Sequence, residues 1–140
     1  MVPQNQCDTF SRFAAGLPEG GDYAEAVAQY EAALSENPAD SLASAGLAQA
    51  KLLIRTSVID FEKVLSSAPT TAEEAMLKAD ACMAVGHPAQ AFSTILTRFA
   101  TVFGDERELL RKHLLELFLI CPPDQPELAD ARRQLAALLY

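Results

Sequence analysis

Residues 21–38 read GDYAEAVAQYEAALSENP, and this stretch decides the fold. Gly21 permits a tight turn because it tolerates positive φ, and Asp22 is a residue type that caps helix starts. Apolar side chains then recur at helical spacing, which predicts one buried face. Pro38 cannot continue a helix. The stretch therefore predicts an amphipathic helix over 22–36.

Small and aromatic side chains share the buried face of this helix. Ala26 and Ala33 let a neighbouring helix approach closely, while Tyr30 fills the space between them. This spacing, with Pro38 after it, is typical of the second helix of a tetratricopeptide repeat (TPR). Such repeats are helical hairpins that stack and offer extended binding surfaces. The stretch therefore favours an interaction surface over catalysis.

Almost every other segment also favours helix, and no period-2 alternation is long enough for a sheet. Proline, glycine and asparagine mark short turns between the helical segments. Eight helices joined in this way predict an all-α, TPR-like superhelical stack of about four hairpins. We expect one domain over 7–140, preceded by a disordered or linker segment, 1–6. The expected helices are 7–16, 22–36, 40–54, 57–66, 70–85, 88–102, 105–120 and 124–139.

Several helix starts and the last helix carry more specific expectations. Thr70 and Glu73 have the spacing of a capping box. His87 precedes a proline suited to a first helical turn, so we expect His87 at the cap. Helix 124–139 should close the stack, since a solenoid end would otherwise expose an apolar face. Its apolar stripe consists of Leu128, Ala131, Leu135 and Leu138.

Composition excludes several classes of partner. The 140 residues carry a net charge of −8, which would repel a phosphate backbone, so we expect no nucleic acid partner. No apolar stretch approaches the ~20 residues that a membrane helix needs, and the N-terminus lacks a signal-peptide pattern. We therefore expect a cytoplasmic protein that does not bind membranes. Cys7, Cys82 and Cys121 form no CxxC pair and should be reduced thiols, two of them in helix packing.

Residues that could carry chemistry have structural explanations. The sequence holds no nucleophile elbow, phosphate-binding loop or dinucleotide fingerprint. The carboxylate pairs Glu73/Glu74 and Glu106/Glu108 lie in first helical turns, where they complement the helix dipole. His113 lies on an apolar face and should be packed and hydrogen-bonded, since no metal-ligand spacing surrounds it. We expect no enzyme activity, no cofactor and no metal.

The inner face of the stack is the first candidate binding surface. A basic clamp for an acidic C-terminal tail would need Lys, Arg or Asn there. The positions expected to line it are instead Ser11, Ala15, Gly46, Glu73 and Leu77. That mode of binding is therefore rejected.

An apolar or mixed groove remains as the predicted protein-binding site. Methionines suit irregular apolar partners, although Met76 and Met83 could instead be core residues. The end of the last helix could dock on a partner or only close the core. The candidate residues are Leu42, Ala45, Gln49 and Leu52 from the second hairpin, Met76, Asp80 and Met83 from the third, and Leu138, Leu139 and Tyr140 at the end.

An ordered set of segments resembles the C-terminal helical half of thioredoxin-like co-chaperones of the YbbN (chaperedoxin) type, particularly actinobacterial ones. The segments are 21–38, 44–53 (SAGLAQAKLL), 86–92 (GHPAQAF), 113–118 (HLLELF) and 131–136 (ARRQLA). The resemblance implies a protein that holds unfolded clients and cooperates with a chaperonin or an Hsp70-type chaperone.

The resemblance does not extend to thiol chemistry. Members of that family carry an N-terminal thioredoxin fold, for which this sequence has no counterpart before residue 7. We expect either a fragment of a longer protein or a chain that has lost this domain. The family's redox cysteines belong to the thioredoxin fold, and Cys7, Cys82 and Cys121 match none of them.

The expected function is therefore a protein–protein interaction module. The resemblance implies the client-holding or chaperone-docking part of a thioredoxin-like co-chaperone. The alternative is a structural self-association scaffold without a chaperone role, because an exposed apolar groove or end helix could pair with its own copy in a homodimer.

Overall fold

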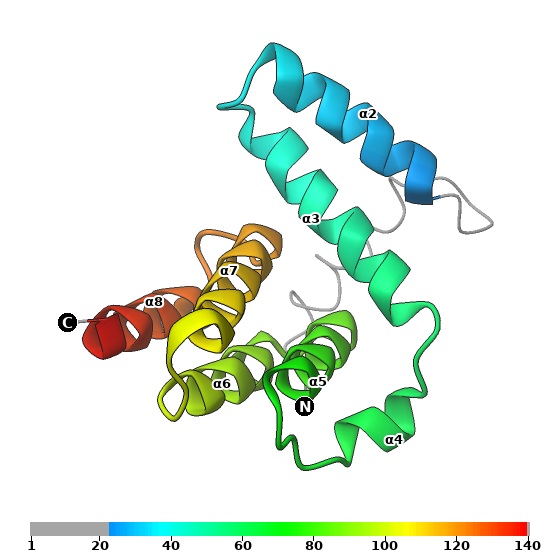
Figure 1. Ribbon diagram of the computed structural model, residues 1–140. Coiled ribbons are helices and arrows are strands. Elements are labelled where there is room, and N and C mark those ends of the chain that lie inside the picture. The colour runs from blue at the N-terminus through cyan, green and yellow to red at the C-terminus, as the bar shows by residue number, and fades with distance from the viewer. Residues whose placement is uncertain (1–22, 140) are drawn as a thin grey trace.

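The computed structural model describes residues 23–139, which form helices and no strand (Figure 1). The all-α expectation is confirmed. The expected helix 7–16 and the segment 1–6 lie outside the described residues, so the domain boundaries stay a prediction. The helices are α2 (Tyr23–Glu36), α3 (Ser41–Thr56), α4 (Phe61–Leu65), α5 (Ala72–Ala84), α6 (Pro88–Phe99), α7 (Gly104–Ile120) and α8 (Pro126–Leu139).

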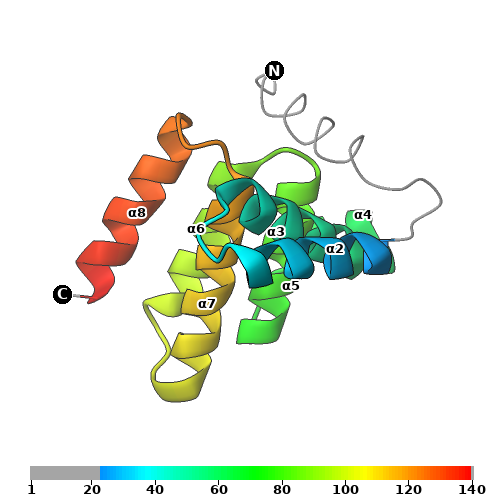
Figure 2. The same ribbon diagram turned by 90° about the horizontal axis from the view of Figure 1, so that it is seen from above.

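The helices are stacked as successive hairpins. α2 packs along α3, and α5 packs along α6, each pair joined by a short turn (Figure 1). The following helices pack on the earlier ones: α5 contacts α3 and α4, and α7 contacts α3, α5 and α6. α8 packs on α6 at the edge of the stack (Figure 2). This is the arrangement in which each repeat covers the apolar face of its neighbour.

The main core lies between α3, α5, α6, α7 and α8. Phe92 and Phe99 are among its largest fully buried side chains, and the Phe92 ring meets the Phe118 ring edge-on at 5.1 Å. Edge-to-face aromatic pairs add stability beyond the area they bury. A second, smaller core joins α2 to α3 through Ala26 and Ala50. α2 is therefore held mainly by one neighbour, whereas α5 to α7 are held from several sides.

Gly46 explains how closely α2 and α3 approach. A Cβ atom at this position would lie 2.5 Å from two atoms of the Tyr30 ring, so the ring rests directly on the α3 backbone. The expectation that Gly46 lines the inner face is wrong, because its small size serves the contact with α2. The predicted role of Tyr30 as the space-filling residue of α2 is confirmed, since Tyr30 packs against the small core with Ala26.

The start of α5 differs from the predicted capping box by one residue. Thr71, not Thr70, is the N-cap, and its hydroxyl accepts a hydrogen bond from the backbone N–H of Glu74 at 3.1 Å. The Glu74 carboxylate in turn accepts from the backbone N–H and hydroxyl of Thr70. The predicted capping box of Thr70 and Glu73 is therefore wrong by one residue, because either of two consecutive threonines can start the helix.

Other boundaries follow the predicted pattern with smaller shifts. His87 holds the N-cap position of α6, but its side chain makes no capping hydrogen bond. α4 is shorter than the expected 57–66, because α3 extends to Thr56 and the side chain of Asp60 caps the new helix at the Lys63 N–H. In α8, the predicted stripe is confirmed: Leu128, Ala131 and Leu135 are buried and Leu138 packs against them. In residues 23–139 no helix is long and apolar enough to cross a membrane.

Candidate functional site

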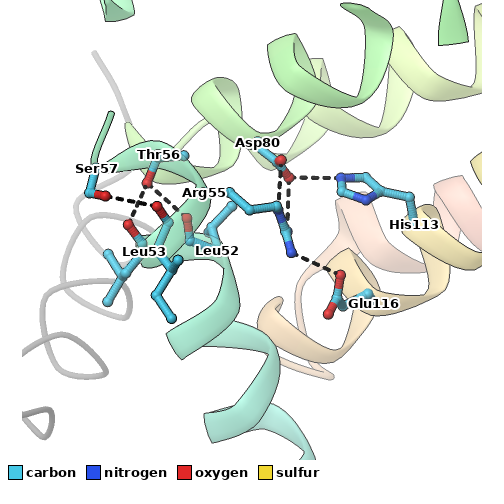
Figure 3. A network of polar contacts seen from close by, with 9 residues as sticks. Leu52, Leu53, Arg55, Thr56, Ser57, Asp80, His113 and Glu116 are labelled. Carbon is cyan, nitrogen blue, oxygen red and sulfur yellow. Dashed lines mark hydrogen bonds and ion pairs between the residues drawn. The ribbon is translucent and has the colours of Figure 1, made fainter. Parts of the chain in front are cut away.

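A polar cluster lies where α3, α5 and α7 meet (Figure 3). The Arg55 guanidinium donates to both oxygens of Asp80, from Nε at 2.8 Å and from Nη2 at 3.0 Å. Its Nη1 donates to Glu116 at 3.2 Å. The Nε2 atom of His113 lies 2.7 Å from Asp80 Oδ1. One carboxylate thus joins three helices.

Burial makes this cluster a strong structural link. Asp80 is 2% exposed, and its ionised carboxylate only accepts hydrogen bonds, so His113 Nε2 must carry the proton that it donates. Burial disfavours the charged Arg55, but the hydrogen bonds and charges of Asp80 and Glu116 outweigh it and raise the pKa of the guanidinium. The prediction that His113 is packed and hydrogen-bonded is confirmed. Every member of the cluster is paired, which favours a positioning role over catalysis.

The predicted protein-binding residues occupy very different environments. Leu52 and Met83 lie in the core, Asp80 in the polar cluster, and Met76 and Leu138 pack at the core's margin. Leu42 is 81% exposed on α3 and Leu139 is 45% exposed on α8, while Ala45 is half-buried. Tyr140 lies outside the described residues. A partner could therefore touch the exposed or half-buried members, and the binding role of the set stays a prediction.

Gln49 is the unusual member of the predicted set. Its side chain is 1% exposed, and neither its amide nitrogen nor its amide oxygen has a hydrogen-bond partner. A buried amide normally finds partners for both atoms. We have no structural explanation for this residue.

An open apolar groove of about 650 Å³ lies between α7 and α8. Three leucines with substantially exposed side chains line it: Leu115 at 39%, Leu119 at 49% and Leu139 at 45%. Phe118, Leu135 and Ala136 complete its apolar lining. Contiguous exposed apolar surface of this kind is typical of interaction sites.

The groove carries a cation on each side. Lys112 lies on α7 and Arg132 on α8, where the Arg132 guanidinium lies 5.8 Å above the Phe118 ring centre. The carboxylate in the lining, Glu116, is already paired with Arg55. In a chain with a net charge of −8, the groove is a local exception.

The described thiols are placed for packing. Cys82 and Cys121 are free and buried, as the sequence predicted for two of the three cysteines, and Cys7 lies outside the described residues. Burial raises the pKa of Cys82, and burial with the nearby carboxylates of Glu127 and Asp124 raises the pKa of Cys121 to about 12. Thiols with raised pKa values are poor nucleophiles at neutral pH. Within residues 23–139 no cluster of His, Cys, Asp and Glu could hold a metal ion.

Comparison with known families agrees with the stacked hairpins. The family model described as "Tetratricopeptide repeat" matches residues 54–140. The chain belongs to the tetratricopeptide repeat family. Members of this family generally mediate protein–protein interaction and are generally not enzymes. The matched residues include α7 and α8, and so the TPR match contains the whole apolar groove.

Relatives of this TPR protein carry no functional description. It is 32% identical over 124 residues to uncharacterised proteins of Mycobacterium tuberculosis and Mycobacterium bovis. The match covers 87% of this chain but 41% of each relative, so the chain spans less than half the length of these relatives. No solved structure matches.

Sequence reasoning missed Leu115, Leu119 and the cations beside them. A signal was present, because Leu115 and Leu119 are four residues apart on a face that does not include the buried Leu110, Leu114 and Leu117. That second apolar stripe was hidden inside a leucine-rich helix, where every leucine could be assigned to the core.

Proposed function

We propose that this chain is a protein-binding module in a chaperone context, the client-holding or chaperone-docking part of a thioredoxin-like co-chaperone. The observation that carries the protein-binding role is the apolar groove between α7 and α8, with its exposed Leu115, Leu119 and Leu139. The membership of the tetratricopeptide family supports the same role. The chaperone context rests on the resemblance of the ordered sequence segments to YbbN-type co-chaperones.

The chemistry of the groove suits either half of this role. An apolar surface takes up exposed leucine, isoleucine or phenylalanine of an unfolded client, and the same surface can seat a helix of a chaperonin or Hsp70-type chaperone. The paired polar cluster at Asp80 contributes by fixing α7 to α3 and α5, so that one wall of the groove is rigid.

The test is suppression of aggregation of a chemically unfolded client by the purified chain, followed by light scattering. We expect suppression to rise with chain concentration and to be weakened by Leu119→Asp. Val58→Asp is the matched control, since Val58 is 87% exposed but does not line the groove. Absence of suppression, together with absence of any chaperone among captured partners, would reject the proposal.

Self-association is the competing outcome. An open apolar groove can be covered by a second copy, and such a dimer would have no need of a client. Multi-angle light scattering of the chain at increasing concentration separates the two functions. A monomer at high concentration agrees with the proposed function, while a dimer that Leu119→Asp dissociates would favour the scaffold.

A further inference from the structure

The stack itself indicates what shape of partner the α7–α8 groove accepts. Each helix that joins the stack contacts more than one earlier helix: α5 contacts α3 and α4, and α7 contacts α3, α5 and α6. α7 and α8 do not pack along each other, since α8 packs on α6, and the open groove lies between them. Within residues 23–139 no helix lies in this groove.

The lining of the groove fits the apolar face of a helix. Leu115 and Leu119 are spaced by one helical turn on α7, and Leu139 faces the same groove from α8. A helix in such a groove is held by apolar side chains at i, i+3 or i+4, and i+7. The occupant is therefore an amphipathic helix with an apolar stripe of leucine-like side chains.

The charges at the groove indicate which charge the bound helix should carry beside its apolar stripe. Lys112 on one side and Arg132 on the other lie at the groove, where the lining carboxylate, Glu116, is ion-paired at 3.2 Å with Arg55, which also binds Asp80. The exposed carboxylate of Glu108, one turn before Lys112, is hydrogen-bonded by Arg111. A helix with carboxylates beside its apolar stripe would complement both cations, whereas lysines there would be repelled.

The same charges argue against a second copy as the occupant. In a two-fold dimer the same patch occurs on both sides of the interface, so the Lys112 and Arg132 rims of the two copies would come together. Like charges brought together in this way oppose association. These charges therefore favour a helix of a different protein over the same face of a second copy.

We propose that the groove between α7 and α8 binds an acidic amphipathic helix of a partner protein, with its leucines on Leu115, Leu119 and Leu139 and its carboxylates on Lys112 and Arg132. This inference rests on the proposed protein-binding function and specifies its site and its ligand. It needs no movement of the core, since the three leucines are already exposed.

The experiment titrates the whole chain with two fluorescent peptides of about 18 residues, or about five helical turns. Both have leucine at the same i, i+4, i+7 positions; one carries glutamate and the other lysine beside the stripe. We expect the glutamate peptide to bind and the lysine peptide to bind at least about tenfold more weakly, because two rim contacts change from attraction to repulsion. Raising the salt concentration should narrow this difference.

Variants of the chain locate the binding. Leu119→Asp should weaken binding of the glutamate peptide by about tenfold or more, since one leucine of the groove is no longer buried by the peptide. Val58→Asp is the control, because Val58 is 87% exposed but does not line the groove. The double variant Lys112→Glu/Arg132→Glu should reverse the preference toward the lysine peptide. Helix content by circular dichroism verifies that each variant is folded.

Two results would overturn the inference. One is equal binding of both peptides, and the other is binding of the glutamate peptide that Leu119→Asp leaves unchanged. Either result, together with client protection by the wild-type chain, would reject this groove while leaving the proposed function in place. If the wild-type chain does not suppress aggregation of a client, the proposed function itself would be rejected.

Discussion

Asp80 is the residue on which three helices converge, because its buried carboxylate accepts from Arg55 of α3 and His113 of α7 while it belongs to α5. Removing its charge should leave the guanidinium without its main partner. We expect Asp80→Asn to lower the free energy of unfolding by about 2–3 kcal/mol. This is less than for a fully buried pair, since the Arg55 side chain is 30% exposed.

Urea unfolding checks this expectation, and Asp130→Asn is its control. Asp130 pairs with Arg133 on the exposed face of α8, where an ion pair contributes less than about 1 kcal/mol. Equal losses in the two variants would show that the cluster at Asp80 does not hold the helices together.

Cys121 makes stability depend on pH in the alkaline range. Burial raises the pKa of the Cys121 thiol to about 12 in the folded chain, whereas the thiol of an unfolded cysteine has a pKa of about 8.5. The unfolded state then binds fewer protons, so stability should fall as pH rises above about 8.5, by at most about 1.4 kcal/mol per pH unit from this thiol. Urea midpoints of the wild type and Cys121→Ala between pH 7 and 10 test this. A wild-type slope no steeper than that of the alanine variant would contradict it.

At the scale of the element, the contact between α2 and α3 depends on one missing side chain. Gly46→Ala would place a methyl group 2.5 Å from the Tyr30 ring, so the ring or the helix must move. Overpacking of this kind costs about 1–3 kcal/mol. α2 should loosen first, since it packs mainly on α3, and hydrogen exchange of its amides would report this.

A double-mutant cycle with Tyr30→Ala identifies the cause. In the Tyr30→Ala background the added methyl group has room, so Gly46→Ala should cost much less there than in the wild type. The same cost in both backgrounds would mean that the glycine matters for helix propensity or for another contact, and not for the aromatic ring.

Helix boundaries show what local sequence can and cannot decide. Six expected helices after Gly21 agree with α2, α3 and α5 to α8 within a few residues, because proline, glycine and capping residues act locally. The start of α5 was displaced by one residue, since Thr70 and Thr71 offer equivalent local signals. The tertiary contact between Ala72 N–H and Glu106, at 3.2 Å, depends on α7 and is invisible locally.

At the scale of the whole molecule, the all-α stack could be predicted, but the helix faces that stay exposed could not. The predicted apolar groove contained Leu52 and Met83, which the fold buries, and the predicted inner face contained Gly46, which packs against Tyr30 of α2. Side-chain periodicity marks the faces of a helix without saying which neighbour covers each face. The exposed stripe of Leu115 and Leu119 became recognisable only once α8 was seen to pack on α6.

The α7–α8 groove is an open apolar surface with a defined chemistry. It combines three exposed leucines with Lys112 and Arg132, in a chain whose net charge is −8. Such a groove can take up the apolar face of a partner helix. We therefore propose that the chain binds a protein of the chaperone machinery through this groove.

The most direct test is capture of partners from host lysate on the immobilised chain, read by mass spectrometry, for the wild type, Leu119→Asp and the control Val58→Asp. The account predicts enrichment of a chaperonin or an Hsp70-type chaperone by the wild type and by Val58→Asp, and its loss with Leu119→Asp. Recovery of only full-length copies of the chain itself, with no chaperone, would contradict it.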